Sequence, residues 1–202
     1  MAVKLAYIFF TMILVDNYVL VKFLGICPFL GVSKKLDSAV GMSLAVTFVM
    51  VLATAATWPI QTFLLTPESG AWDLGYLQTI VFILIIAILV QLLENILKKF
   101  IPALYKSLGV YLPLITTNCT ILGVTILNID NGYNFMESIV CAAGAGIGFL
   151  VAMVLFSGVR RRVEEAVTPK CFEGLPITLV SAAVTSLSFM GFGGIIESIF
   201  HV

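Results

Sequence analysis

The sequence predicts an all-α polytopic membrane protein, with six transmembrane helices arranged as two inverted three-helix repeats whose first helices are broken. Three observations predict this fold. The 202-residue chain is 60% hydrophobic and only 11% charged, whereas a typical soluble domain is about 25% charged. Six apolar stretches are long enough to cross a bilayer. The two halves of the chain also share a repeated motif. A chain of this composition can leave apolar side chains on its surface only in lipid.

Each expected span is an apolar run of about 20 residues, the length that crosses the hydrocarbon core of a bilayer. The six runs are residues 5–26, 39–60, 77–97, 103–127, 135–157 and 175–200. Polar or turn-rich segments separate them, among them residues 33–37, 66–70, 128–134 and 160–174. We interpret the first run as a transmembrane helix and not a signal peptide, because no small-residue cleavage site follows it. Residues 1–202 are expected to form a single membrane domain.

The charged residues predict the orientation of these spans. The connections after the first, third and fifth runs hold nine of the 11 Lys and Arg residues, including Arg160–Arg162, and the other two connections hold none. By the positive-inside rule the first set is cytoplasmic, which places both termini outside. The formal net charge of +0 argues against a nucleic-acid partner, because binding to phosphates needs a basic face.

A seven-residue motif occurs once in each half of the chain. Cys27–Ser33 and Cys119–Thr125 share the pattern C-x-x-L-G-V-[ST]. Shorter matches follow in the same order at separations of 92 to 103 residues, so repeat one covers about 1–101 and repeat two about 102–202. Because each repeat holds three spans, the second must insert upside down relative to the first. Many transporters have this plan, with functional sites at broken helices near the bilayer midplane.

Helix-breaking residues surround both motif cysteines. They are Gly25, Pro28 and Gly31 in the first repeat, and Pro113, Thr116, Thr117, Asn118 and Gly123 in the second. Pro28 lacks a backbone donor and is expected to disfavour helix at Cys27. If two interrupted helices meet at depth, the pseudo-two-fold axis brings Cys27 and Cys119 face to face.

Two facing thiols inside a membrane suit a soft metal, and cysteine thiolates, usually four per cluster, hold iron–sulfur clusters. Cys141 lies near the outer end of the fifth run and Cys171 in a cytoplasmic connection, so neither is expected to reach a midplane site. A cluster at Cys27 and Cys119 would therefore need two further thiolates from a second subunit. Two alternatives stay open, in which the cysteines are small packing residues or form a disulfide.

The stretches around both cysteines resemble a known family. Residues 24–33, LGICPFLGVS, and residues 112–124, LPLITTNCTILGV, carry the resemblance. They are similar to the family that contains the A subunit of the Rnf complex, the membrane-bound ferredoxin:NAD oxidoreductase, and the E subunit of the sodium-translocating NADH:quinone reductase. The likeness spans the whole chain, and neither cysteine departs from the family pattern.

The resemblance implies an electron-transfer subunit, not catalytic by itself, of an ion-translocating oxidoreductase in the bacterial cytoplasmic (inner) membrane. It implies a homologous six-helix partner of opposite orientation and one [2Fe–2S] cluster shared between the two. Cys27 and Cys119 would be this chain's ligands, and the partner would supply two further cysteines. The cluster would relay electrons between the flavins and iron–sulfur centres of neighbouring subunits, and this electron flow would be coupled to transport of Na+ or H+.

The alternative function is a small inverted-repeat secondary transporter or channel without redox chemistry. The same repeats and broken helices would serve it. Its polar ligands would be Ser33, Thr116, Thr117 and Asn118. Replacement of both motif cysteines by serine discriminates the two functions, because only a cluster subunit needs the thiols.

Other polar residues and glycines have structural interpretations. Asp16 and Asn17 are candidates for contact with an ion or a partner, but a local polar network explains them equally well. Glu94 and Glu197 close the third span of each half, near helix ends where carboxylates reach water. The glycines of Gly144–Gly148 do not follow a strand, so we expect close helix packing there and not a nucleotide loop.

Overall fold

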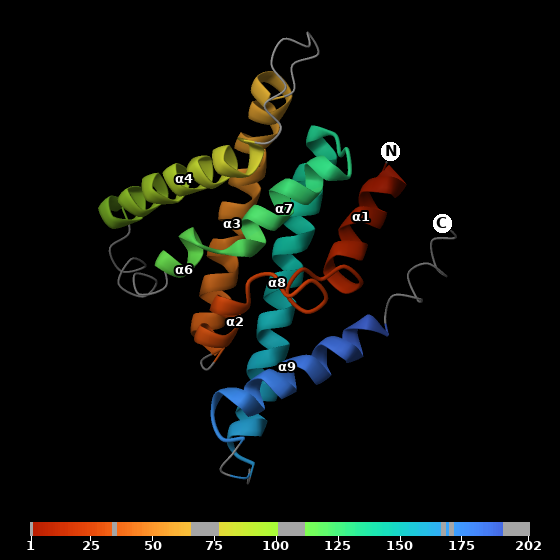
Figure 1. Ribbon diagram of the computed structural model, residues 1–202, viewed down its shortest axis with the longest axis vertical. Helices are drawn as coiled ribbons and strands as arrows, with labels where there is room; N and C mark the ends of the chain where they lie inside the picture. The colour runs from red at the N-terminus through yellow and green to blue at the C-terminus, as the bar shows by residue number, and fades with distance from the viewer. Residues whose placement is uncertain are drawn as a thin grey trace.

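The computed structural model describes residues 2–33, 36–65, 77–100, 112–166, 169 and 172–191 (Figure 1). The helices in chain order are α1 (Ala2–Leu14), α2 (Ile26–Val32), α3 (Leu36–Ile60), the π-helix η1 (Gln61–Leu65), α4 (Gln78–Phe100), α6 (Leu112–Thr116), α7 (Cys119–Asp130), α8 (Phe135–Glu164) and α9 (Leu175–Met190). No strand occurs in the described part of the chain, which confirms the predicted all-α class.

The two longest helices, α3 and α8, pack against each other at the centre of the molecule (Figure 1). Glycines allow the close approach, because a Cβ at Gly146 of α8 would overlap the side chain of Thr47 on α3. On the neighbouring face of α8, a Cβ at Gly144 or Gly148 would lie 3.1 or 2.9 Å from a carbonyl oxygen of α1. The predicted role of these glycines in helix packing is therefore confirmed.

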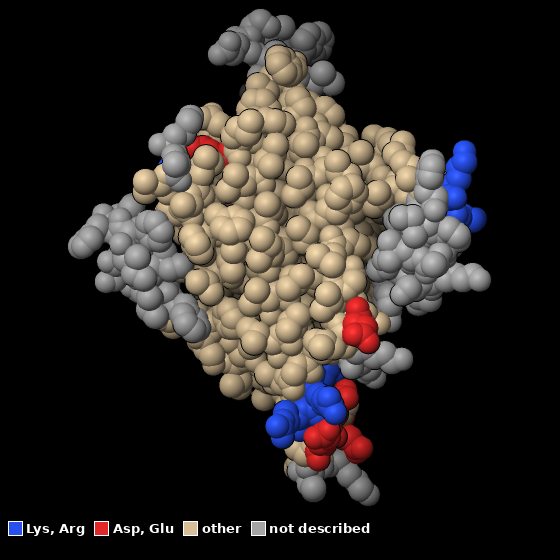
Figure 2. Space-filling view, turned by 180° about the vertical axis from the view of Figure 1, so that it is seen from behind, with Lys and Arg blue, Asp and Glu red and all other residues tan. Residues whose placement is uncertain are grey.

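The apolar helices overlap the six runs expected from the sequence. Leu36–Phe63, Gln78–Ile96 and Phe135–Glu164 are long and apolar enough to cross a membrane. Val3–Leu14, Leu114–Asp130 and Leu175–Met190 are shorter apolar helices in the other three runs, and parts of the fourth and sixth runs lie outside the described residues. Figure 2 shows a broad face almost free of charged side chains, which gather at its margins. Such a surface suits lipid.

The helices α4 and α9 slope away from the central pair in opposite directions, α4 beside the upper part of α3 and α9 beside the lower end of α8 (Figure 1). Only 17% of the apolar window of α4 is buried inside the molecule, compared with 56% for α8. The outer face of α4 is therefore left for lipid or for another subunit.

The fifth run continues as a helix well beyond its expected end. We expected a polar connection from residue 160, but α8 extends to Glu164 and includes all three arginines. Arg160 pairs with Glu164, and Arg161 with Glu165, each at i,i+4. Such pairs favour helix, which explains why the helix outlasts the apolar run.

Candidate functional site

The first helix is broken between Leu14, where α1 ends, and Ile26, where α2 begins. Asn17 is fully buried and organises this break. Its Nδ2 donates to the carbonyl of Gly148 in the middle of α8, at 2.8 Å. Its Oδ1 accepts from the backbone N–H groups of Val19 and Leu20, at 3.0 and 3.3 Å. Asn17 therefore supplies the partners that a helix would otherwise give these backbone groups.

The break ends in a turn that places Cys27 inside a helix. Phe23 and Gly25 have positive φ angles of 54° and 84°, and Gly25 is the N-cap of α2. The expectation that Pro28 disfavours helix at Cys27 is wrong, because both residues lie in the first turn of α2. The missing N–H of proline is tolerated there, since N–H groups in the first turn have no partner within the helix.

The second break separates α6, which ends at Thr116, from α7, which begins at Cys119. Asn118 caps α7, because its Oδ1 accepts from the N–H of Thr120 at 3.1 Å. Each motif cysteine thus lies at the beginning of a helix directly after a break. The expectation of broken helices at both cysteines is confirmed for the described residues.

The two breaks meet each other. The N–H of Gly25 donates to Sγ of Cys119 at 2.9 Å, across 94 residues of sequence. A Cβ at Gly123 would lie 2.6 Å from a methyl carbon of Leu24, and a Cβ at Gly25 would overlap the hydroxyl of Thr120. The segment before Cys27 and the segment after Cys119 are therefore interlocked, and glycine is required on both sides.

The cysteines differ in accessibility. Cys27 and Cys119 are both exposed, while Cys141 is buried. Cys171 lies outside the described residues. Among the described residues no group of three or more His, Cys, Asp or Glu side chains is placed to hold a metal ion. The exposed thiols of Cys27 and Cys119 are therefore available to a partner, and their role as cluster ligands stays a prediction.

A pocket of about 330 Å³ opens beside Cys119. Its lining residues are Ile83, Ile86 and Ala87 of α4, together with Thr116, Thr117, Asn118, Cys119 and Leu122. Each water takes about 30 Å³ in the liquid, so the pocket has room for a side chain or a small inorganic group.

The surroundings of Cys119 are rich in hydrogen-bond donors. The Gly25 N–H is one donor. The side chains of Asn118 and Thr120, which are 4% and 0% exposed, supply two more, because neither Asn118 Nδ2 nor Thr120 Oγ1 has a partner in the structure. The positive end of the α7 dipole adds to this field, because Cys119 is the first residue of that helix. Donors and dipole together suit an anionic group bound at this end of α7.

Comparison with known proteins establishes the family. Residues 5–196 match the family described as "Rnf-Nqr subunit, membrane protein", and both breaks lie inside the match. The chain belongs to the Rnf-Nqr family.

Relatives of this Rnf-Nqr protein are similar over nearly their whole length. It is 57% identical over 190 residues to the A subunit of the Na+-translocating ferredoxin:NAD+ oxidoreductase complex of Acetobacterium woodii, covering 94% of this chain and 97% of the relative. It is 53% identical over 184 residues to the A subunit of the ion-translocating oxidoreductase complex of Syntrophotalea carbinolica, covering 91% and 93%. It is 54% identical over 185 residues to the subunit of the same name in Serratia proteamaculans, covering 92% and 94%. The resemblance seen in the cysteine motifs is confirmed.

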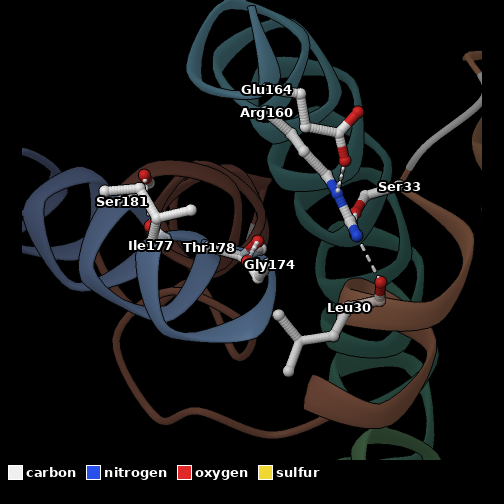
Figure 3. Close-up of polar contacts among 8 residues, drawn as sticks. All are labelled: Leu30, Ser33, Arg160, Glu164, Gly174, Ile177, Thr178 and Ser181. Atoms are coloured by element: carbon white, nitrogen blue, oxygen red, sulfur yellow. Dashed lines mark hydrogen bonds and ion pairs between the residues drawn. The ribbon is translucent and has the colours of Figure 1, made fainter. Parts of the chain in front are cut away.

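The Rnf-Nqr chain also contains a buried arginine that the sequence pattern did not single out. The side chain of Arg160 is only 6% exposed, whereas that of Arg161 is 85% exposed. Figure 3 shows its guanidinium at the end of α2, where Nη1 donates to the carbonyl of Leu30 and, at 2.8 Å, to Oγ of Ser33. Nε donates to Glu164 at 3.0 Å. Arg160 thus fixes the C-terminal end of the helix that carries Cys27.

The sequence signal for Arg160 was present but ambiguous. Three consecutive arginines after an apolar run are typical of an orientation signal. On a helix, however, consecutive residues point about 100° apart, so only one of three neighbours can face a packed helix. The glutamate at i+4 does not distinguish Arg160 from Arg161, since both have one.

The remaining candidates of this Rnf-Nqr chain have structural roles or lie outside the described residues. Asp16 is 4.0 Å from Nζ of Lys22, which also lies over the Tyr18 ring at 5.0 Å. These contacts of Asp16, and the backbone hydrogen bonds of Asn17, agree with the structural interpretation of the two residues. Glu94 is half-buried on α4, and Glu197 lies outside the described residues.

Proposed function

We propose that this chain is an electron-transfer subunit of an ion-translocating ferredoxin:NAD oxidoreductase of the Rnf type. Its relatives are named as the A subunit of such complexes. In this proposal Cys27 and Cys119 hold half of a [2Fe–2S] cluster within the membrane, and a homologous six-helix subunit supplies the other two cysteines. The observation that carries the proposal is the meeting of the two breaks, where the Gly25 N–H reaches Cys119 Sγ.

The site fits half of a shared cluster. Such clusters are usually held by four thiolates, and this chain offers two exposed thiols at neighbouring breaks. The donors around Cys119 suit an anionic, sulfur-rich group. When bound, the cluster would carry one electron at a time between the redox centres of neighbouring subunits. The chain's own residues then have distinct tasks: Cys27 and Cys119 bind, Gly25 donates to sulfur, and Arg160 holds α2 in place.

The depth of the site agrees with a position inside the bilayer. The first break is tied to Gly148 through Asn17, and a Cβ at Gly25 would lie 3.1 Å from the ring of Phe149. Both residues are at the middle of the 30-residue helix α8, which is about 45 Å long. If α8 spans the membrane, the cysteines lie near its midplane.

The arrangement of the helices supports an inverted repeat of two three-span units. The long helices α3 and α8 hold equivalent central places, and α4 and α9 leave them in opposite directions (Figure 1). We propose that repeat one covers about 1–101 and repeat two about 102–202, with both termini outside the bacterial inner membrane. Electron flow would be coupled to Na+ or H+ transport by alternate exposure of the two repeats. The contact between Gly25 and Cys119 would then differ between the two states.

The transporter alternative is less well supported by the site. Of its four polar ligands, Ser33 already accepts a hydrogen bond from Arg160, whose positive charge disfavours a cation nearby. Asn118 already uses its carbonyl oxygen to cap α7, and its unpaired NH2 group is a donor that cannot bind a cation.

Electron paramagnetic resonance (EPR) on the complete complex tests the proposal. The complex is reduced with dithionite, and difference spectra compare wild type with Cys27→Ser, Cys119→Ser and the buried control Cys141→Ser. We expect one [2Fe–2S] signal to disappear in the first two variants and to persist in the third, with all complexes assembled. A signal that survives in both motif variants would refute the ligand assignment. If the wild-type complex, prepared intact and under anaerobic conditions, lacks this signal, the transporter alternative is favoured.

The coupling hypothesis has its own test. Proteoliposomes with the Cys27→Ser complex are expected to lose redox-driven ion uptake together with the cluster. Uptake that continues undiminished without the cluster would contradict the coupling.

A further inference from the structure

The two exposed cysteines have different surroundings. Sγ of Cys119 accepts the N–H of Gly25 at 2.9 Å. Within the described part of the chain no hydrogen bond reaches Sγ of Cys27. The described residues therefore give a hydrogen-bond donor to the sulfur of Cys119 and none to that of Cys27.

The donor of this bond is held in a fixed position. Gly25 has a φ of 84°, a left-handed conformation that glycine adopts without strain. A Cβ at this position would overlap Thr120 Oγ1 and lie 3.1 Å from the ring of Phe149 and 3.2 Å from Asn118 Oδ1. The backbone is thus enclosed on three sides, and its N–H is aimed at Cys119.

A second donor lies directly beside Cys119. Asn118 is 4% exposed, and its Oδ1 accepts a hydrogen bond from the N–H of Thr120. This bond sets the orientation of the side-chain amide, so Nδ2 faces away from the Thr120 N–H. Nδ2 is buried without a partner. A buried donor without an acceptor is unfavourable, and such groups in native proteins call for an explanation such as a redox role. Sulfur atoms of a bound cluster are acceptors that this chain alone does not contain.

We propose that the Gly25 N–H and the Asn118 side-chain amide raise the reduction potential of the cluster held at Cys119. This inference rests on the proposed cluster function and adds the residues that tune it. Reduction adds negative charge to the cluster and its sulfurs, and donors aimed at those sulfurs stabilise that charge. Hydrogen bonds to the sulfurs are among the features that set iron–sulfur potentials.

Asn118→Ser and Asn118→Asp test the side-chain donor. Both replacements keep an oxygen that can cap α7, and both remove the NH2 group. Asn128→Ser is the matched control, because it is the same change on the same helix and its Nδ2 bonds to the carbonyl of Ser138 instead. The readout is a redox titration of the complete complex followed by EPR.

We expect Asn118→Ser to lower the midpoint potential, with about a tenfold fall in the ratio of reduced to oxidised cluster, equivalent to about 59 mV for a one-electron couple. Asn118→Asp adds negative charge and should lower the potential further. Asn128→Ser should leave it unchanged. If both Asn118 variants contain the cluster and its potential equals that of wild type, the inference is wrong but the proposed function stands. If the wild-type complex lacks the cluster, both are wrong.

A measurement on the wild-type complex tests Gly25 and does not depend on variant folding. The complex is prepared with 15N-glycine, and the reduced cluster is studied by pulsed EPR. We expect a 15N coupling from the Gly25 peptide nitrogen, because its N–H bonds to a cluster ligand. If the labelled cluster shows no such coupling, the hydrogen bond is absent in the loaded protein and the inference is wrong.

Discussion

Replacement of Arg160 by alanine removes a buried guanidinium from the end of α2 and leaves two acceptors inside the protein without their donor. These acceptors are the carbonyl of Leu30 and the hydroxyl of Ser33 (Figure 3). The same change breaks the ion pair with Glu164, whose side chain is 51% exposed. The variant therefore removes the polar contacts of Arg160 between α8 and the helix that carries Cys27.

The expected loss is dominated by the two buried hydrogen bonds. A hydrogen bond from a charged donor contributes about 1.5–3 kcal/mol, and the half-exposed ion pair adds little. We expect Arg160→Ala to lower the free energy of unfolding by about 3 kcal/mol. Arg160→Lys keeps the charge but loses the planar fork that reaches several acceptors, so its loss should be smaller.

Arg161→Ala is the matched control, because Arg161 is on the same helix turn and is 85% exposed. Its distance to Glu165 is 3.7 Å, longer than the 3.0 Å between Arg160 and Glu164. Exposed pairs of this kind contribute about 0–1 kcal/mol. The assay is unfolding of the purified chain in mixed micelles by a rising fraction of sodium dodecyl sulfate, followed by circular dichroism. Equal and small losses for Arg160→Ala and Arg161→Ala would show that the buried contacts of Arg160 do not support α2.

Two further pairs of variants can be measured in the same way. Gly148→Ala places a Cβ 2.9 Å from the carbonyl of Met12 and should cost about 1–3 kcal/mol. The control Gly158→Ala, on the same helix, meets nothing within 4 Å and should stabilise the protein by about 0.5–1 kcal/mol. A Gly158→Ala variant less stable than Gly148→Ala would contradict the described packing. Asn17→Ala removes the donor to the carbonyl of Gly148 and leaves the N–H groups of Val19 and Leu20 without their acceptor, and it should cost about 2–4 kcal/mol. Asn95→Ala is the exposed control and should stay within about 0.5 kcal/mol, and equal effects at the two asparagines would refute the role of Asn17.

The long helices could be located from the sequence because their information is local. A run of about 20 apolar residues is itself the requirement for a span, so α3 and α4 begin and end within a few residues of the expected windows. The breaks were also located, since the repeated motif and its flanking glycine, proline and asparagine residues mark them. These signals fixed where the two candidate cysteines lie along the chain.

The details of the site depend on contacts that no local pattern encodes. The bond from Gly25 to Cys119 joins residues 94 positions apart, and the bonds of Arg160 to Leu30 and Ser33 span 130 and 127 positions. The prediction for Pro28 was wrong for a related reason. Proline interrupts a helix interior but is accepted in the first turn, and the start of α2 is set by the preceding turn at Gly25.

The tie between Asn17 and Gly148 has a consequence for biogenesis. Gly148 is made 131 residues after Asn17, a delay of roughly 7–26 s at the usual rate of synthesis. During that time the side-chain NH2 group of Asn17 lacks its acceptor on α8, and lipid offers no replacement. We therefore expect the segment between α1 and α2 to reach its final position only after α8 has been inserted. The fold of the first break is thus completed by a contact with the second half of the chain.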